Sequence, residues 1–360
     1  MKKIGIITIV DNNNYGNRLQ NYATVKIYEK FGYIAETLVL NPRRNSAKYL
    51  FRAIRMMIIP IKEKYRLKKS DVLTFKRILR FREFNKKNHI TIKTYPFWNP
   101  KVLRKKYKFF SVGSDQIWNP NLDHGYGIDF LDFAMPSQRI TLSPSFGVDH
   151  ISPEKQKNYV RGLKKFQYLS VREKSGADLI KSLTGQDATV LIDPTMLLSK
   201  EEWKQIECKP ANVDVDNSYI LEYFLGGKND STESEISDFA KLHELKRLQT
   251  LCKDFPELYC TNPGEFIYLI EHAKVVFTDS FHAVVFSIIF GKPFVIYERK
   301  NQKEMGSRII TLLKKVGLED RTFAGINENT MNIDYKKCYD LLENEKKKAY
   351  DFLCKSMSIK

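Results

Sequence analysis

Three side chains with different chemistry stand where an apolar, β-rich run ends and a polar stretch begins: Asp115, Arg172 and His282. In open α/β sheets, ligands bind beyond the carboxyl ends of the strands, which makes these positions candidates for an active site. A histidine there can act as a general acid, and an aspartate can act as a base toward a sugar hydroxyl. An arginine fork suits carboxylates and phosphates.

Each of the three also has a structural interpretation. Asp115 can cap a helix expected after it, and chemistry alone favours that cap. Arg172 can pair with Glu173 or with another surface acid. A lone histidine is more often structural than catalytic, but at a strand-to-helix junction beside Asp279 the pKa of His282 is tunable.

A fourth polar stretch, residues 12–20, follows the first apolar run. Its Asn14, Tyr15, Gly16 and Gln20 can present backbone N–H groups and amides to an anion at the start of a helix. No G-x-G-x-x-G pattern occurs, so dinucleotide binding gains no support. An asparagine-rich turn that only caps the helix explains the same residues equally well.

Basic residues follow the apolar run that ends at Tyr297. Because they leave the same edge of the expected sheet as His282, they are predicted to form a cationic pocket with Arg172. The alternative is an ordinary lysine-rich surface loop. These residues are Arg299, Lys300, Lys303 and Arg308.

The expected elements alternate between strand and helix. A strand over 4–10, a loop over 11–17, a helix over 19–31 and a strand over 34–40 form a β-α-β unit, the opening of a doubly wound sheet. Further strands are expected at 109–112, 140–144, 168–171, 189–192, 219–223, 246–250, 275–278 and 294–297.

This pattern predicts two Rossmann-like domains, residues 1–208 and 209–335, with a linker near 209–212. A final helical segment, 336–360, is expected to pack back on the first domain. Residues 48–89 form a basic insertion with two amphipathic helices broken at Pro60. The insertion offers an apolar face and flanking Lys and Arg for anionic lipid, whereas the alternative is that it packs on the first domain.

The charge balance indicates an anionic partner. The chain has 360 residues, and 60 Lys and Arg against 42 Asp and Glu give a net charge of +18. Such a chain attracts nucleic acid, acidic lipid, or phosphorylated and carboxylated substrates, although solvated surface lysines explain it too. No specific nucleic-acid partner is expected, because the basic helices alternate with aliphatic rather than aromatic residues and no known motif occurs.

Other residue types narrow the class of protein. Five cysteines without a C-x-x-C pair argue against a disulfide framework or a zinc site and for a reducing compartment. Neither a metal nor a cofactor is expected. Asp11 ends the first apolar run too early for a signal peptide, and no apolar stretch approaches a membrane-spanning length. The expectation is a cytoplasmic protein, at most peripheral at the inner face of the membrane.

Taken in order, several stretches resemble the polysaccharide pyruvyltransferase family from the first strand to about Arg308. Ala283 departs from the glycine that commonly follows the family's histidine, and Asn17 from a small residue. The matching stretches are Asn14-Tyr15-Gly16, Leu19-Gln20, Tyr22-Ala23, Val112-Gly113-Ser114-Asp115-Gln116-Ile117-Trp118-Asn119, Ser145-Phe146-Gly147, Ser170-Val171-Arg172-Glu173, Asp193-Pro194-Thr195, Thr278-Asp279-Ser280-Phe281-His282 and Gly291-Lys292-Pro293.

The resemblance implies two Rossmann-like domains facing a central cleft, similar to two-lobed (GT-B-like) glycosyltransferases. It implies phosphoenolpyruvate as donor and a sugar hydroxyl pair of a cell-surface polysaccharide, or of its lipid-linked precursor, as acceptor. The product is a pyruvate ketal. It also implies that Arg172 binds the donor and that His282 is catalytic.

With these substrates, the expected catalytic residues are His282 as acid and Asp115 as base. The expected substrate-binding residues are Arg172, Arg308, Ser280, Phe281, Asn14, Tyr15, Gly16 and Gln20. The alternative function is a GT-B-type glycosyltransferase that uses a nucleotide sugar. A product with an added sugar in place of a ketal would select it.

Overall fold

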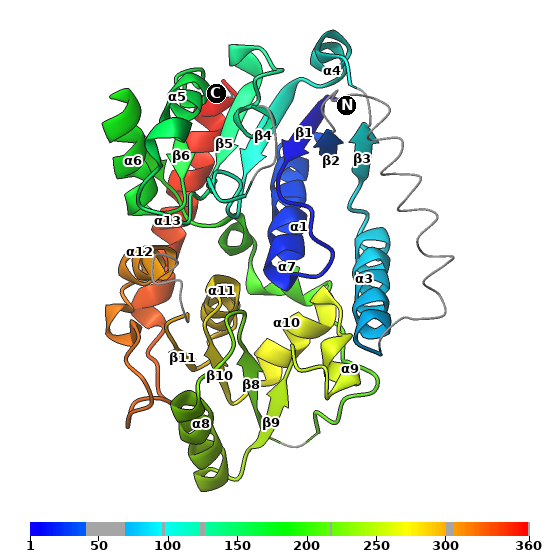
Figure 1. Ribbon diagram of the computed structural model, residues 1–360, viewed down its shortest axis with the longest axis vertical. Coiled ribbons are helices and arrows are strands. Elements are labelled where there is room, and N and C mark those ends of the chain that lie inside the picture. Colours follow the sequence, from blue (N-terminus) through cyan, green and yellow to red (C-terminus); the bar gives the residue numbers. More distant parts are fainter. Residues whose placement is uncertain (41–68, 96–97, 123–126, 217, 300–305, 359–360) are drawn as a thin grey trace.

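Two parallel β-sheets form the framework of the computed structural model, which describes residues 1–40, 69–95, 98–122, 127–216, 218–299 and 306–358 (Figure 1). The first sheet has the order β3-β2-β1-β4-β5. Every neighbouring pair in it is parallel. Its strands are β1 (Lys3–Ile7), β2 (Ile34–Leu40), β3 (Ile92–Tyr95), β4 (Phe109–Gly113) and β5 (Arg139–Leu142).

The second sheet has the order β11-β10-β8-β9, and its pairs are parallel as well. A short parallel pair, β6 with β7, follows the first sheet along the chain. The strands are β8 (Tyr219–Tyr223), β9 (Lys246–Gln249), β10 (Val275–Thr278), β11 (Phe294–Ile296), β6 (Ser170–Val171) and β7 (Thr189–Val190). The predicted α/β class with parallel sheets is confirmed.

Helices cover both faces of each sheet, as parallel strands with crossover connections require. They are α1 (Tyr15–Lys30), α3 (Lys69–Lys87), α4 (Pro100–Lys106), α5 (Pro153–Leu163), α6 (Lys174–Thr184), α7 (Lys200–Lys204), α8 (Asp230–Leu242), α9 (Pro256–Tyr259), α10 (Pro263–His272), α11 (Phe281–Phe290), α12 (Ser307–Val316) and α13 (Lys336–Ser356), with a 3₁₀ turn, η3, at Pro194–Leu197.

The largest apolar cluster joins the two halves of the molecule through helices that lie between the sheets. All ten residues of α11 are buried, which fits its almost wholly apolar sequence. Trp203 lies in this core, with ring centroids 4.9 Å from Phe286 and 5.5 Å from Tyr22. Because α1 and α11 share one core, residues at their first turns are held in a fixed relation.

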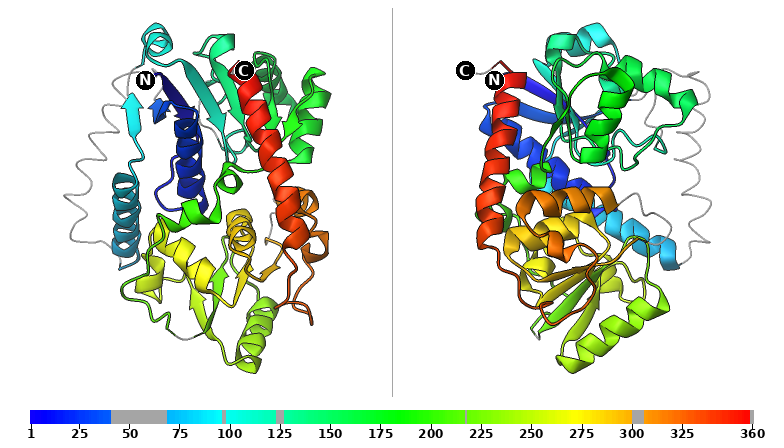
Figure 2. Two further views of the ribbon diagram at one scale, coloured as in Figure 1. Left: turned by 180° about the vertical axis from the view of Figure 1, so that it is seen from behind. Right: turned by 90° about the vertical axis from the view of Figure 1, so that its left-hand side faces the viewer.

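The last helix, α13, runs along the back of the molecule from the second half toward the first (Figure 2). Its Tyr350 donates from its hydroxyl to the carbonyl oxygen of Leu197 at 3.5 Å, and its ring lies 5.9 Å from that of Phe31. α13 also packs on α12, so it spans both halves.

Each sheet has a point where consecutive connections diverge. In the first sheet the chain leaves β1 toward β2 and leaves the neighbouring β4 toward β5. In the second sheet β8 leads to β9 while its neighbour β10 leads to β11. Such switch points leave a crevice at the carboxyl ends of the strands, where ligands bind in this fold class. Asp115 follows β4 and His282 follows β10, so each sheet brings one candidate residue to its crevice.

Several boundaries differ from the sequence prediction. β1 ends at Ile7 rather than at residue 10, and α1 begins at Tyr15, four residues earlier than expected. The reason is Asn14, whose side chain accepts from the Asn17 backbone N–H at 3.1 Å and thereby starts the helix inside the expected loop. β3 was not predicted, because its alternation is largely polar. Of the basic insertion, residues 48–68 lie outside the described residues, and the remainder contains α3.

Candidate active site

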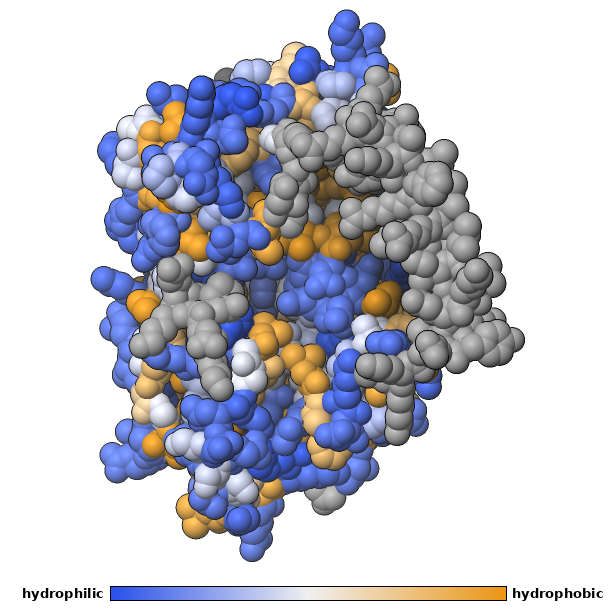
Figure 3. All heavy atoms as spheres, in the orientation of Figure 1, coloured by the Kyte–Doolittle hydropathy of each residue, from blue (hydrophilic) through white to orange (hydrophobic). Residues whose placement is uncertain are grey.

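Two residues singled out in the sequence, Arg172 and His282, meet at one fully buried carboxylate, that of Asp193, and Asp115 joins the group through Arg172. Arg172 Nη1 donates to Asp193 Oδ2 at 2.8 Å, and His282 Nε2 lies 3.8 Å from the same oxygen. Arg172 Nη2 also lies 3.5 Å from Asp115 Oδ1. In the space-filling view, hydrophilic side chains gather in a hollow where the two halves meet, bordered by apolar ones (Figure 3).

Asp193 is the residue whose role the sequence did not reveal. Its Oδ2 also accepts from Ser114 Oγ at 2.6 Å, and its Oδ1 accepts from the backbone and hydroxyl of Thr195 at 3.0 and 2.7 Å. Burial opposes its ionisation, but His282, Arg172 and the two hydroxyl donors outweigh burial and lower the pKa of Asp193 to about 2. Asp193 is therefore a fixed negative charge. The Asp-Pro-Thr stretch after β7 was the signal for it.

The Arg172 guanidinium is placed by charge and by an aromatic ring. It lies 4.5 Å from the centroid of the Phe281 ring, over which Arg308 also lies, at 5.8 Å. Burial opposes its charge, but Asp193 and then Asp115 outweigh burial and raise the pKa of Arg172. Its Nε is buried without a hydrogen-bond partner among the described residues. The guanidinium can therefore still donate to a ligand.

Arg308 is a second buried cation at the same place. It stands in the first turn of α12, and its Nη1 is 4.0 Å from Asp115 Oδ1. Burial and then Arg172 lower the pKa of Arg308 to about 10, so it is charged at neutral pH. The structure thus brings Arg172 and Arg308 together, whereas Lys300 and Lys303 lie outside the described residues. Arg299 instead binds Asp279 through its Nε at 3.3 Å.

His282 occupies the first turn of α11 with its side chain 8% exposed. Its Nε2 is buried and has no hydrogen-bond partner among the residues that the structure describes. Burial lowers the pKa of His282 below the ordinary imidazole value, although Asp193 and Asp115 oppose this. The resting imidazole is therefore neutral at pH 7, with one ring nitrogen ready to meet a ligand.

Gly16 explains why the first loop and the histidine stretch belong to one site. A Cβ at Gly16 would lie 2.1 Å from Nδ1 of His282, so only glycine fits beneath this ring. The first turn of α1 thus forms the wall against which the imidazole is held. The contact joins residues 266 positions apart in the chain, which no local pattern in the sequence could show.

Asp115 is the more accessible carboxylate of the site, with its side chain 17% exposed. Asn17 Nδ2 donates to its Oδ2 at 3.3 Å. Burial alone would raise its pKa, but the cations around it, Arg172 foremost, hold the pKa of Asp115 below its usual value. The expected helix cap is wrong: residues 115–118 form turns, and the carboxylate faces Arg172 and Asn17 instead.

The remaining candidates of the first loop divide into two groups. Asn14 caps α1. Gln20 is buried, where its Nε2 donates to Thr8 Oγ1 at 2.9 Å. Tyr15 is fully buried and stacks on Phe266 at 4.2 Å, far from an open surface. The structure therefore brings only Gly16 of this group to His282, and substrate binding by the others stays a prediction.

Ser280 and Asp279 complete the turn before α11. Ser280 is buried at the N-cap of that helix, and its side chain makes no capping hydrogen bond. Asp279 accepts from the backbone N–H groups of Leu225 and Gly226, each at 2.7 Å. Asp279 therefore ties the β8 and β10 loops of the second crevice together. Burial lowers the pKa of His282, and the carboxylates that oppose this are Asp193 and Asp115 rather than Asp279.

Three helix N-termini surround the two arginines. The N-cap residues of α6, α11 and α12 are Glu173, Ser280 and Gly306, and none of these caps the helix through its side chain. α6 and α12 touch where the Lys174 N–H donates to Thr311 Oγ1 at 3.4 Å. Helix N-termini carry a positive partial charge and N–H groups without intrahelical partners, and at α6 the Lys174 N–H is already taken by Thr311, so the arrangement favours an anion chiefly at α11 and α12.

The model of the family described as polysaccharide pyruvyl transferase matches residues 14–301. The chain belongs to this family. It is accordingly a transferase, and the family connects it with polysaccharide biosynthesis. The match covers Asp115, Arg172, Asp193 and His282, whereas Arg308 lies beyond its end.

A comparison of this pyruvyl transferase family member with curated proteins finds no match. Among solved structures, it is similar to a putative UDP-N-acetylglucosamine 2-epimerase from Listeria monocytogenes, with a TM-score of 0.48 and 10% identity over 98% of this chain and 90% of that one. For the Neisseria meningitidis UDP-GlcNAc 2-epimerase bound to UDP-GlcNAc, the TM-score is 0.46 and the sequence identity is 11%, over 99% of this chain and 100% of that one. For a Rickettsia africae glycosyltransferase, the TM-score is 0.45 and the sequence identity is 9%, over 98% of this chain and 99% of that one.

Across the described residues of this family member, no helix combines the length and the apolar character needed to cross a membrane.

Proposed function

We propose that the protein transfers a pyruvyl group from phosphoenolpyruvate to a pair of sugar hydroxyls on a cell-surface polysaccharide or its lipid-linked precursor. The observation that carries the proposal is the pair of buried guanidiniums, Arg172 and Arg308, over one aromatic ring beside three uncapped helix N-termini. A small polyanion with a carboxylate and a phosphate matches this arrangement of charge.

The donor is expected to bind with its two anionic groups on different cations. Arg172, whose fork is already oriented by Asp193, suits the planar carboxylate. Arg308 and the first turn of α12 then face the phosphate. The buried Nε2 of His282 would lie beside the methylene carbon, and Phe281 would support the flat donor from below.

The chemistry needs one acid, one base and a positive centre that is held in place. The imidazolium of His282 protonates the methylene carbon, and C2 becomes oxocarbenium-like. A sugar hydroxyl attacks C2 and gives its proton to Asp115, whose low pKa suffices for so electrophilic a centre. Phosphate then leaves with the electron pair of its C–O bond. The second hydroxyl closes the ketal, and its proton leaves with the phosphate.

The proton on His282 would arrive together with the donor. In the resting site, burial disfavours the imidazolium. A bound polyanion adds negative charge beside the ring and therefore raises the pKa of His282 in the complex. Asp193, 3.8 Å from Nε2, stabilises the imidazolium that forms. The site thus holds a reactive acid only when the donor is present.

The test is incubation of the full chain with phosphoenolpyruvate and lipid-linked glycans, followed by mass spectrometry of the product and phosphate release. The expected result is a ketal adduct with one phosphate per transfer. A parallel reaction with nucleotide sugars distinguishes the glycosyltransferase alternative, because it would add a sugar. Arg172→Lys is the matched variant: it keeps the charge but loses the fork, so donor affinity measured by calorimetry should fall.

A peripheral contact with anionic membrane is the second part of the proposal, and α3 supports it. Its Val72, Phe75 and Leu79 are exposed at 39%, 58% and 39%, in a helical stripe beside exposed lysines. An acceptor on a lipid carrier would make such a contact useful. Liposome flotation with and without anionic lipid tests it. A Phe75→Ser, Leu79→Ser variant that floats as well as the unchanged protein contradicts it.

A further inference from the structure

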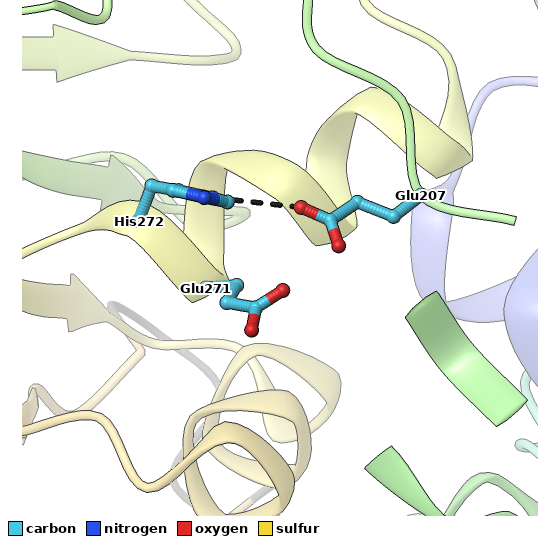
Figure 4. A group of neighbouring side chains, drawn as sticks. All are labelled: Glu207, Glu271 and His272. Carbon is cyan, nitrogen blue, oxygen red and sulfur yellow. Dashed lines mark ion pairs between the residues drawn. The ribbon is translucent and has the colours of Figure 1, made fainter. Parts of the chain in front are cut away.

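A second group of ionisable side chains uses none of the residues of the active site. It lies where the stretch after α7 meets the carboxyl end of α10, and it consists of Glu207, Glu271 and His272 (Figure 4). One ligand atom from each residue lies within 4.8 Å of the others. In the described part of the chain this is the one such group of three.

Glu271 supplies the observation that points to a missing partner. Its side chain is only 8% exposed, and its Oε1 accepts from Lys204 Nζ at 2.8 Å. Its Oε2 is buried and has no hydrogen-bond partner among the described residues. In Figure 4 this carboxylate points toward that of Glu207, which itself lies 3.5 Å from His272 Nδ1. Lys200 Nζ also lies 3.6 Å from Oε1, so Oε2 is the atom of Glu271 left for a further positive partner.

The surroundings favour a cation at this point. Glu271 and His272 stand in the last turn of α10, where the helix carries negative partial charge. The carboxylates of Glu207 and Glu271 face each other and repel, because the ligand atoms of this group lie within 4.8 Å of one another. Lys204 and Lys200 approach Oε1 of Glu271, and a dication between the two carboxylates would relieve the repulsion that remains.

We propose that Glu207, Glu271 and His272 bind one divalent transition-metal ion of the manganese or zinc type. Two carboxylates and one imidazole form the mixed oxygen and nitrogen ligand set that such ions accept. His272 would bind the ion through Nε2, or would give up the 3.0 Å contact of its Nδ1 with the carbonyl oxygen of Tyr268. Three protein ligands leave the remaining coordination positions to water. Because Glu207 follows α7 and the other two ligands end α10, the ion would join the connection between the two sheets to the second half.

Lys204 is the internal competitor for this site. Its ammonium contacts Glu271, but its side chain is 49% exposed and can swing into solvent. A dication at Oε2 would repel the ammonium at Oε1, because both cations share the charge of one carboxylate. Removing the lysine should therefore strengthen metal binding, whereas removing a ligand should weaken it. Loss of the lysine and loss of a ligand should therefore change the metal affinity in opposite directions.

The experiment titrates the full-length, chelator-treated protein with Mn²⁺ and measures free Mn²⁺ by electron paramagnetic resonance. Mn²⁺ is chosen because the five cysteines would compete for a softer ion. We expect one ion per chain, an affinity lower by at least about tenfold in Glu271→Gln and Glu207→Gln, and a higher affinity in Lys204→Gln. Glu154→Gln, on α5, is the control and should bind as the unchanged protein.

His272→Gln keeps the test decisive if a glutamate variant fails to fold. His272 is 44% exposed, and thermal unfolding measures the cost of losing its stacking on Tyr268, 3.9 Å away between ring centroids. Absence of Mn²⁺ uptake by the unchanged protein overturns the proposal and leaves a shared proton between the two glutamates. The same holds if Glu271→Gln and His272→Gln bind Mn²⁺ as tightly as the unchanged protein does. Pyruvyl transfer is not part of the measurement, so the outcome is independent of the proposed function.

Discussion

Two aspartates contact different nitrogens of the same arginine, Arg172, and their surroundings differ sharply. Asp193, after β7, is fully buried and accepts hydrogen bonds of 2.6 to 3.0 Å on both oxygens. Asp115, after β4, keeps 17% of its side chain exposed and makes only longer contacts, from 3.3 to 4.0 Å. One carboxylate is saturated and the other retains free acceptor capacity.

This difference separates positioning from chemistry. A saturated carboxylate cannot accept a proton from a substrate without giving up bonds that orient Arg172, so Asp193 is best suited to hold the site in place. A carboxylate with weak contacts can turn toward a hydroxyl, so Asp115 suits the base. The same reasoning assigns His282 to the chemistry, because its Nε2 has no hydrogen-bond partner among the described residues and is the atom left for reaction.

The largest expected effect is that of His282→Ala. Loss of a general acid typically costs about 100- to 10,000-fold in rate. We expect a rate loss in this range, measured as phosphate release, with donor affinity in calorimetry changed far less. Thermal unfolding serves as the control, because the ring packs on Gly16 and some stability is lost with it. Turnover near that of the unchanged protein in a folded variant would remove His282 from the chemistry.

Asp193→Asn should chiefly affect stability and binding. It leaves Arg172 buried without its main counterion, and breaking a buried pair typically costs about 3 to 5 kcal/mol. Because the folded pKa of Asp193 is about 2, its contribution is complete above the ordinary carboxyl pKa and is lost as pH falls toward 2. Denaturant unfolding at pH 7 and at acid pH measures both effects. An unchanged free energy of unfolding would contradict the positioning role.

Asp115→Asn should give the opposite pattern. Its contacts are long and partly solvated, so we expect the free energy of unfolding to change by less than in Asp193→Asn. The rate should fall by about 100-fold, the lower end for loss of a general base. If the two asparagine variants lose stability and rate in the same proportion, the distinction between the two aspartates is wrong.

Much of this site could be predicted because it follows from strand ends. Asp115 and His282 each follow a recognisable apolar run, and each parallel sheet carries such a residue to its own carboxyl edge. Asp193 also follows a strand, but its role depends on β7 pairing with β6, which places it beside Arg172. The spacing of residues in the sequence does not predict how β7 pairs with β6.

The direction of each side chain in the first loop is a second property that could not be predicted from the sequence. Asn14-Tyr15-Gly16 was predicted as one binding stretch. Tyr15, however, packs on Phe266 of α10, and its hydroxyl accepts from Arg77 Nη1 of α3 at 2.8 Å. Gly16 instead faces His282. On a helix, successive residues point about 100° apart, so neighbours in the motif serve different surfaces. Buried partners such as Arg77 lie on a helix that is remote in the chain.

The smallest expected effect, and the finest test of the comparison, is a shift in pH dependence. A general acid must be protonated, so kcat/KM for the donor should fall as pH rises through the pKa of His282 in the free enzyme, which lies below the ordinary imidazole value. The corresponding limb of kcat should lie at higher pH, because the bound anion stabilises the imidazolium.

Arg308→Gln identifies the group that causes this limb. Arg308 is one of the cations that disfavour the imidazolium, so its removal should raise the pKa of His282 and move the limb of kcat/KM toward higher pH. His282→Ala should lose the limb altogether. Ionisation of the donor's own phosphate would give a limb at the same pH in every variant. A limb that stays in place in both variants would therefore assign the titration to the donor and take the proton transfer away from His282.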